Sequence, residues 1–336
     1  MKKNSILVLL FLCLLIPCNK LISQNKVTYS FDKKIPVPGD GGYDYLSIDS
    51  VMNRLYISHG TSVNVLDLKT ETLIGEIKDM KGVHGIAIDN ELNRGFISDG
   101  KANAVVAFDL KTFEKIATIP VSGIGPDAIM YDPSSKKVYS FNGESKDASV
   151  VDAKSLKQVG TIKLGGGPEF AVSDLKGKIF NNIEDLNQLK VLDSHSLKVI
   201  DSFPLSPCGT PTGLALDLKY GRIFTGCRKN KGLSVLDMVS GKVLTTVPIG
   251  GGVDAVVYNP NNQLIFCSCG DGTTSIIQQG PNDSYTLLQT LTTEPRAKTM
   301  AMDFKTGKIY LSAPSFETGT RKIVPGSFHL LVYKPN

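Results

Sequence analysis

The sequence predicts an all-β chain that folds as a seven-bladed β-propeller with four antiparallel strands in each blade. A short motif that ends in Asp or Asn recurs seven times, and each copy is followed by further β-rich runs without helical periodicity. An unpaired β-rich run precedes the first copy, and the last copy is followed by one run too few. Repeats of roughly 40–45 residues with four strands each are typical of propeller blades.

The repeat is defined by the residue that closes each motif, as Asp132 does in GIGPDAIMYD. Successive closing residues, called anchors below, are 40, 43, 42, 43, 42 and 44 residues apart. Asp and Asn side chains stabilise tight turns by bonding nearby backbone groups. We therefore interpret the anchors as structural turn residues: Asp49, Asp89, Asp132, Asp174, Asp217, Asn259 and Asp303.

Each unit contains three β-rich runs after its anchor, such as KVYSF, ASVVDA and QVGTIKL in the third unit. Apolar alternation, β-branched residues and intervening Gly, Asn and Asp predict strands. The seventh unit ends at FHLLVYKPN without a final run, whereas VTYSFDKKIPV, residues 27–37, stands alone before the first unit. We expect this N-terminal strand to complete the last blade and close the ring, in one domain of residues 27–336.

Residues 1–23 have the pattern of a secretory signal peptide, because Lys2 and Lys3 precede the apolar run 6–16. Cleavage after Ser23 is expected to release the protein into the periplasm or the extracellular space. Cys18 leaves an outer-membrane lipoprotein as the alternative, although Pro17 directly before it fits lipid attachment poorly. No later run is apolar enough to form a transmembrane segment.

Four cysteines follow the signal region, and in an exported protein they are candidates for disulfides. Cys208 and Cys227 lie at the two ends of one predicted hairpin in the fifth unit and are the first choice for a bond. Cys227 with Cys269, at equivalent positions of adjacent units, is the competing pair. Four buried free thiols, including Cys267, are the remaining alternative.

The residue five positions before each anchor is the main candidate for function. It lies where a Gly- or Pro-containing loop leads into the innermost strand, so all seven copies are expected at one mouth of the central channel. Their chemical variety exceeds what a backbone requirement alone would produce, and we expect a ligand site there, with a structural or solvated mouth as the alternative. These mouth residues are Asp44, His84, Asp127, Glu169, Thr212, Asp254 and Lys298.

A second layer of candidates follows if the hairpin register is unbroken. That register pairs Asp44 with His59, His84 with Asp99, Asp127 with Asn142, Thr212 with Cys227, Asp254 with Cys269 and Lys298 with Ala313, while Glu169 faces Ile183 or Glu184. Directly opposed residues on antiparallel strands can touch, so His84 with Asp99 is a candidate for an oriented general base. A slip of one residue would remove every pair.

Four of the mouth residues are acidic, which favours a cation, a metal or a substrate with a basic group. No cofactor is specified; if a metal binds, a divalent cation such as Ca²⁺, which needs six to eight oxygens, is expected on Asp44, Asp127, Glu169 and Asp254. A bound metal could activate water for lactone or ester hydrolysis. The chain contains no HExxH, GxSxG or CxxC motif.

The charge balance disfavours a nucleic-acid partner. The chain has 37 Lys and Arg against 32 Asp and Glu, and removal of residues 1–23 leaves 34 against 32, a formal charge of +2. Nucleic-acid-binding domains usually carry a strongly basic face. The basic loop GCRKNKG, residues 226–232, is interpreted as solvated and would be the first candidate for an anionic polymer.

The repeats resemble the YncE-like, YVTN-repeat propeller proteins of bacterial envelopes over roughly residues 27–336. The resemblance rests on VHGIAID, GPDAIMYDPSSKKVYSFNG, PEFAVSD, NNIED, PTGLALD, GVDAVVYNP and TMAMDFKTGKIYL. It implies an exported seven-bladed propeller from a family mostly without an assigned reaction, in which some relatives are thought to bind macromolecules, including DNA. Fold alone does not specify activity.

The function expected from the sequence is an exported bacterial envelope protein that binds or scaffolds a small molecule or an envelope protein at the channel mouth. A metal-assisted, lactonase-like hydrolase with its site at the same mouth is the first alternative, and a nucleic-acid binder is the second. No motif specifies an oligomeric state, and a monomer is the expectation.

Overall fold

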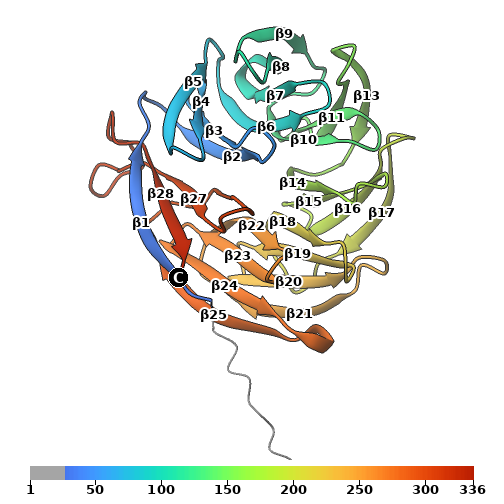
Figure 1. Cartoon of the computed structure of the whole chain (residues 1–336). Helices are drawn as coiled ribbons and strands as arrows, with labels where there is room; N and C mark the ends of the chain where they lie inside the picture. The colour runs from blue at the N-terminus through green and yellow to red at the C-terminus, as the bar shows by residue number, and fades with distance from the viewer. Residues whose placement is uncertain (1–26) are drawn as a thin grey trace, which may run out of the picture.

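Seven antiparallel sheets of four strands each stand around a central axis in the computed structural model of the chain, which describes residues 27–336 (Figure 1). The predicted signal peptide and Cys18 lie outside the described residues. Regular structure within residues 27–336 is β-strand except for two short 3-10 helices, η1 (Gly100–Ala102) and η2 (Pro281–Asp283). No helix of this region is long and apolar enough to cross a membrane. The prediction of an all-β, seven-bladed propeller is confirmed.

In the first six blades the strands run in chain order from an inner strand near the axis to an outer strand at the rim (Figure 1). Blades 1 to 3 consist of β2 (Tyr43–Asp49), β3 (Arg54–His59), β4 (Ser62–Asp67) and β5 (Thr72–Ile77); β6 (Val83–Asp89), β7 (Arg94–Asp99), β8 (Ala104–Asp109) and β9 (Lys115–Pro120); and β10 (Pro126–Asp132), β11 (Lys137–Asn142), β12 (Asp147–Asp152) and β13 (Lys157–Lys163). Blades 4 to 6 consist of β14 (Pro168–Ser173), β15 (Lys178–Ile183), β16 (Gln188–Asp193) and β17 (Lys198–Pro204); β18 (Pro211–Asp217), β19 (Arg222–Cys227), β20 (Gly232–Asp237) and β21 (Val243–Pro248); and β22 (Val253–Asn259), β23 (Leu264–Cys269), β24 (Thr273–Gln279) and β25 (Tyr285–Thr292).

Blade 7 joins the two ends of the described chain. Its strands follow the order β26 (Met300–Met302), β27 (Ile309–Ala313), β28 (His329–Pro335) and β1 (Tyr29–Pro36). β1 pairs antiparallel with β28 along its length and forms the outer strand. The N-terminal strand therefore closes the ring as predicted, and the backbone groups of β28 do not form an exposed sheet edge.

The anchors have the structural role predicted for them. In blade 1 an Oδ atom of Asp49 accepts hydrogen bonds from the amides of Val51 and Met52, at 2.9 and 3.0 Å. Equivalent bonds, from an amide two or three residues later in the chain, are made by Asp89, Asp132, Asp174, Asp217, Asn259 and Asp303. The same local chemistry thus builds the first turn of every blade.

The core is divided among the junctions between blades. Each of the seven junctions has its own cluster of buried apolar side chains, contributed by both neighbouring sheets. At the junction of blades 1 and 2, for example, the rings of Tyr56 and Phe108 pack 5.6 Å apart. Because every blade is packed on both sides, the inner strands are held in fixed positions around the axis.

Candidate binding site at the channel mouth

The mouth residues of blades 1 to 6 lie in β-bulges. In blade 1, Tyr43 pairs with His59 and Leu46 pairs with Ile57, so two residues, one of them Asp44, face a single residue of β3. The inner hairpins of blades 2 to 6 have the same register shift at the same place. A bulge inserts one residue into a strand and redirects its side chain. The bulges therefore turn the mouth residues away from the partners that an unbroken ladder would give them.

The predicted cross-strand pairs are wrong for this reason. The residue opposite each second strand end is the neighbour of the mouth residue, namely Tyr43 for His59, Val83 for Asp99, Pro126 for Asn142, Pro168 for Ile183, Pro211 for Cys227 and Val253 for Cys269. In blade 7, Lys298 precedes β26 and does not pair with Ala313. The register was counted from the turn, and the inserted residue moves each partner in blades 1 to 6 by one; in blade 7 the ladder has no bulge and ends at Met300 before it reaches Lys298.

Asp99 does not orient His84 as a general base. Its carboxylate is buried and accepts hydrogen bonds from the backbone amides of Lys81 and Gly82, at distances of 2.8–3.1 Å. Asp99 therefore fixes the loop that precedes β6. The prediction of His84 and Asp99 as a catalytic pair is therefore wrong: Asp99 is a structural acid, and His84 is a mouth residue with other partners.

Three further predicted site residues are also buried and bonded within the fold. The ring of His59 packs 4.2 Å from that of Phe328, and burial lowers the pKa of His59. The amide of Asn142 donates to Asp147, at 2.9 Å. Thr212 donates its hydroxyl to a backbone carbonyl of blade 6, also at 2.9 Å. We assign all three a structural role.

Neighbouring blades hold the backbone of the bulges. At five junctions a Ser or Asn of the second strand donates to the carbonyl of the next mouth residue: Ser58 to His84, Ser98 to Asp127, Asn182 to Thr212, Ser268 to Lys298 and Ser312 to Asp44. A buried carbonyl freed from the ladder needs such a donor. The mouth side chains consequently project from a backbone that is fixed on both sides.

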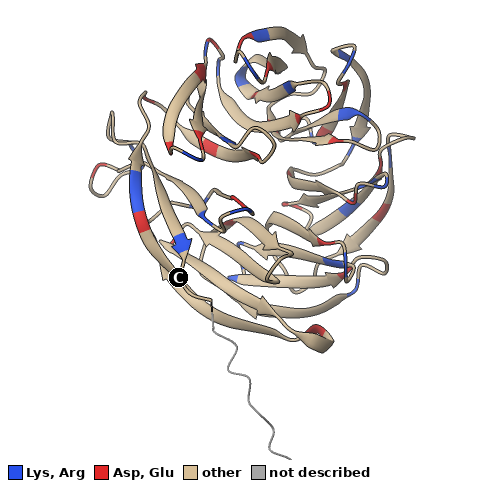
Figure 2. Cartoon of the chain, viewed as in Figure 1, with Lys and Arg blue, Asp and Glu red and all other residues tan. Residues whose placement is uncertain are grey.

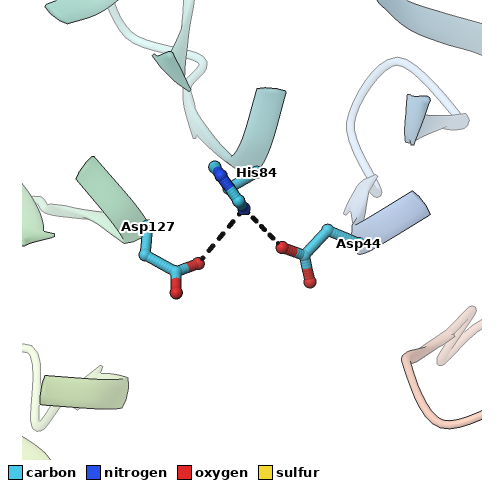
Figure 3. A group of neighbouring side chains, drawn as sticks. All are labelled: Asp44, His84 and Asp127. Carbon is cyan, nitrogen blue, oxygen red and sulfur yellow. Dashed lines mark hydrogen bonds and ion pairs between the residues drawn. The ribbon is translucent and has the colours of Figure 1, made fainter. Parts of the chain in front are cut away.

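Three mouth residues from neighbouring blades converge, and we call them the Asp44–His84–Asp127 cluster. Figure 3 shows their side chains pointing toward one another from β2, β6 and β10. His84 Nδ1 lies 2.7 Å from Asp44 Oδ2 and 3.6 Å from Asp127 Oδ1. The hydrogen bond with Asp44 raises the pKa of His84 against the opposing effect of burial. The charged imidazolium is thereby favoured.

Asp127 is an acid of the mouth whose charge is poorly compensated. Its Oδ1 atom is buried and has no hydrogen-bond partner among residues 27–336. Burial, followed by the charge of Asp44, raises the pKa of Asp127 to about 7, although the charge of His84 acts in the opposite direction. Near neutral pH this carboxyl therefore exchanges between its neutral and charged forms.

The opposite side of the mouth is neutralised by ion pairs. Asp254, whose side chain is only 7% exposed, accepts from Arg228 at 2.5 Å and from Lys298 at 2.6 Å. Arg228 also donates to Glu184, at 2.9 Å. Burial and the neighbouring Glu184 raise the pKa of Glu169 to about 9, so its neutral form dominates at pH 7. Both oxygens of the Asp254 carboxylate are already occupied.

Arg228 was not recognised as a mouth residue from the sequence, and Glu184 was considered only as one of two residues that Glu169 could face. The loop that contains Arg228 was interpreted as solvated, and the ion pairs correct this. Both residues directly follow a second strand, at a position that is glycine in four other blades: Gly60, Gly100, Gly143 and Gly270. In all six blades the amide of this residue donates to a carbonyl of the loop before the inner strand. Comparison of the second strand ends would have identified the two charged exceptions.

A disulfide between Cys208 and Cys227 connects the loop before β18 to the end of β19. This is the pair preferred from the sequence. Arg228 follows Cys227 directly, so the bond fixes the backbone next to the ion-paired half of the mouth. Cys267 and Cys269 are buried free thiols in the structure.

Aromatic side chains form the floor of the mouth. Tyr45, the residue after Asp44, extends from blade 1 to Phe170 of blade 4, and the two ring centroids are 4.8 Å apart. The two rings border a small cavity of about 150 Å³ with Phe141 and Ile129. Blades 1 and 4 stand on different sides of the axis (Figure 1). The two rings therefore meet between blades on different sides of the axis, next to the mouth residues Asp44 and Glu169 in the sequence.

Only two of the four predicted metal ligands come together. Single ligand atoms of Asp44, His84 and Asp127 lie within 4.8 Å of one another. Asp254 is occupied by two cations, and Glu169 lies beside Glu184 instead. One imidazole with two carboxylates suits Zn²⁺ or another transition metal better than Ca²⁺, which prefers six to eight oxygens.

Charges of both signs are distributed around the ring (Figure 2). Lys and Arg are interspersed with Asp and Glu on several blades, and most of the ribbon is neither basic nor acidic. Many of them form ion pairs, as between Lys146 and Asp185 at 2.8 Å. In this view basic and acidic residues are mixed around the ring and are not separated into regions of one sign.

Comparison with known proteins gives one distant similarity. Part of the chain is 25% identical over 189 residues to Antigen Lp49 of Leptospira interrogans serogroup Icterohaemorrhagiae serovar copenhageni (strain Fiocruz L1-130). The matched region is 53% of this chain and 41% of that protein, so the chain spans less than half the length of this relative. No protein-family model matches the chain.

Proposed function

We propose that this protein acts outside the cytoplasm, in the cell envelope, as a binding or scaffold protein whose channel mouth receives a cationic group of a small molecule or partner protein. One observation carries this proposal. Asp254 has both oxygens bound by protein cations, whereas Asp127 keeps a buried oxygen without a donor among the described residues. We infer that the free Oδ1 atom of Asp127 accepts a hydrogen bond from a donor group of the ligand.

The side chains at this part of the mouth favour an ammonium or guanidinium group as the ligand. A buried acceptor left without a partner costs about 1–3 kcal/mol, which a ligand donor would recover. The nearby carboxylate of Asp44 adds attraction for a positive charge, while the ring faces of Tyr45 and Phe170 below it favour cations in the same way. We therefore propose lysine- or arginine-like groups as the ligand class.

The proposed location is supported by three observations. Residues 1–23 have the composition of a signal peptide, with Cys18 leaving lipid anchoring as the alternative. The disulfide between Cys208 and Cys227 is typical of proteins in oxidising compartments. The name of the leptospiral relative, an antigen, is in line with a place outside the cytoplasm. We further propose that the protein is related to the YncE-like propellers that its repeats resemble, which would also place it in the cell envelope.

Calorimetry with short peptides tests the binding role. The probes are N-acetylated, C-amidated peptides that differ only in carrying Lys, Arg or norleucine at one position. We expect the Lys or Arg peptide to bind more tightly than the norleucine peptide, and Asp127→Asn to remove the difference. Asp79→Asn is the matched control, because that side chain is 87% exposed and faces Lys115 of the outer strand β9. Equal binding of all three peptides by the unaltered protein would refute the proposal.

A metal-assisted hydrolase is a second candidate, based on the three convergent ligand atoms of the Asp44–His84–Asp127 cluster. A divalent ion held there would supply an activated water for ester or lactone hydrolysis. Titration of the purified protein with Zn²⁺ tests whether the cluster binds a metal. His84→Ala should abolish the binding of Zn²⁺. Failure of any divalent ion to bind would exclude it. If chelator-treated protein still binds the Lys peptide, the organic-cation proposal holds.

A further inference from the structure

Blade 7 carries an unusually long connection between its second and third strands. Residues 314–328 join β27 to β28, whereas the corresponding connections in blades 1 to 6 are two to four residues long. The segment is folded: Phe316 forms a β-bridge with Ile323, and the amide of Gly326 donates to Asp40 at 2.9 Å. In Figure 1 it lies in the red part of the chain. Long, ordered connections in compact domains frequently carry function.

This segment covers a pocket beside the channel mouth. The pocket has a volume of about 410 Å³ and is lined by Tyr43, Arg296, Lys298, Phe316, Arg321 and Ile323. Arg321 and Ile323 also line a neighbouring hollow of about 230 Å³. The combined space is of the size that small ligands occupy. One wall is aromatic and aliphatic, and the rest is cationic.

The two arginines of the pocket are not neutralised by the protein. Arginines that form ion pairs within residues 27–336 are Arg222 and Arg228. Arg296 instead stacks its guanidinium 4.1 Å from the ring centroid of Phe316 and donates weakly to a loop carbonyl, at 3.3 Å. Arg321 is exposed at the rim. Both guanidinium groups keep donors for an external acceptor.

The backbone of Arg296 is held in a conformation that favours glycine. Its φ angle is 68°, in the left-handed region. Its carbonyl accepts from the hydroxyl of Tyr43 at 2.7 Å, and its amide donates to the carbonyl of Gly270 at 2.8 Å. Such conformations are retained where the surroundings impose them, often at ligand clamps. The guanidinium of Arg296 is thereby fixed over the pocket in advance of any ligand.

We propose that this pocket binds an oxyanion attached to a flat, apolar body, such as an aromatic phosphate or carboxylate. Guanidinium groups form paired, charge-assisted hydrogen bonds with such oxyanions. Phe316, Ile323 and Tyr43 supply an apolar wall for the body of the ligand. The site is separate from the Asp44–His84–Asp127 cluster and takes a ligand of opposite charge. It therefore goes beyond the proposed binding of a cation.

Calorimetry with defined probes tests the proposal. The probes are phenyl phosphate, benzoate, inorganic phosphate and phenol, at constant ionic strength. We expect phenyl phosphate or benzoate to bind at least several-fold more tightly than inorganic phosphate and phenol, and the tighter of the two identifies the headgroup. Arg321→Ala should weaken this binding about tenfold, as expected for the loss of one charge-assisted contact. Arg321 is exposed, so the variant should fold normally.

Lys322→Ala provides the matched control. It removes one positive charge from the same loop, but Lys322 is 72% exposed, pairs with Glu317 at 2.8 Å and does not line the pocket. We expect its affinity for the probe to equal that of the unaltered protein. Equal weakening by Lys322→Ala and Arg321→Ala, or no binding of either aromatic oxyanion, would overturn the proposal. The probes used here are anions or neutral molecules, so failure of the Lys peptide to bind at the Asp44–His84–Asp127 cluster does not affect this result.

Discussion

Replacement of Asp127 by Asn should stabilise the fold at neutral and alkaline pH. Burial, with a smaller contribution from Asp44, raises the pKa of Asp127 to about 7 in the folded protein. The folded state therefore keeps a proton that the unfolded chain releases at lower pH. The stability of the unaltered protein should fall as pH rises from about 4 to about 7 and change little above that range. Asn has no proton to lose, so the variant lacks this decline.

The magnitude follows from the size of the shift. The difference between the ordinary pKa of 3.8 and about 7 corresponds to about 4 kcal/mol, at roughly 1.4 kcal/mol per pKa unit. The Asp127 side chain is 39% exposed, and water screens part of this cost, so we expect a gain of about 2 kcal/mol. The gain should become small toward pH 4, because the unfolded carboxyl begins to take up its proton near its ordinary pKa of 3.8 and the two states then differ less in bound protons.

Urea unfolding at about pH 4.5 and about pH 8, analysed by linear extrapolation, measures both free energies. Asp254→Asn is the matched control, since it changes a mouth carboxylate that is already paired with Arg228 and Lys298. It should destabilise the fold by about 2–4 kcal/mol, because two partly buried cations lose their shared anion. If Asp127→Asn gives no gain at the higher pH, or the same gain at both values, Asp127 is not the uncompensated group described above.

Three further predictions concern binding, the disulfide and ring closure. The affinity for a Lys peptide should rise between about pH 6 and about pH 8 in calorimetry, because Asp127, whose pKa is raised to about 7, ionises over this range. Cys208→Ser should cost about 3 kcal/mol in urea unfolding, since the bond closes a chain segment of separation 19. Deletion of residues 27–37 should expose the edge of β28, lower the Tm and cause self-association detectable by light scattering.

Features that repeat in every unit could be predicted from the sequence. Asp49 and Asp132 stabilise their turns through contacts with residues two or three positions away, so local pattern is sufficient. The number of blades and the closure by β1 follow from counting the runs. The position of the mouth residues at one end of the ring also follows, because equivalent positions of a repeat lie at equivalent places in space.

The partners of the mouth residues could not be predicted by the same reasoning. The bulge at His84 adds one residue to the inner strand without a sequence signal in that strand, and the contacts of His84 are made with neighbouring blades instead of its own. Contacts between blades depend on how adjacent sheets pack, which no single unit specifies. Glu184 and Arg228 were detectable, because they replace a glycine found at that position in four other blades.

The two sides of the mouth differ in how their acidic side chains are neutralised, and we propose that one side stabilises the fold while the other binds the ligand. Asp254, Arg228 and Lys298 satisfy one another and add to the joining of blades 5, 6 and 7. Asp127 occupies the same structural position but forms no such pair with Lys or Arg within residues 27–336, and His84, 3.6 Å away, is shared with Asp44. Asp127 and Asp254 both lie in bulges of their inner strands, and they differ in the partners of their side chains. An uncompensated acid on a fixed backbone is costly to the fold and advantageous for binding, and this is why Asp127→Asn separates the two effects.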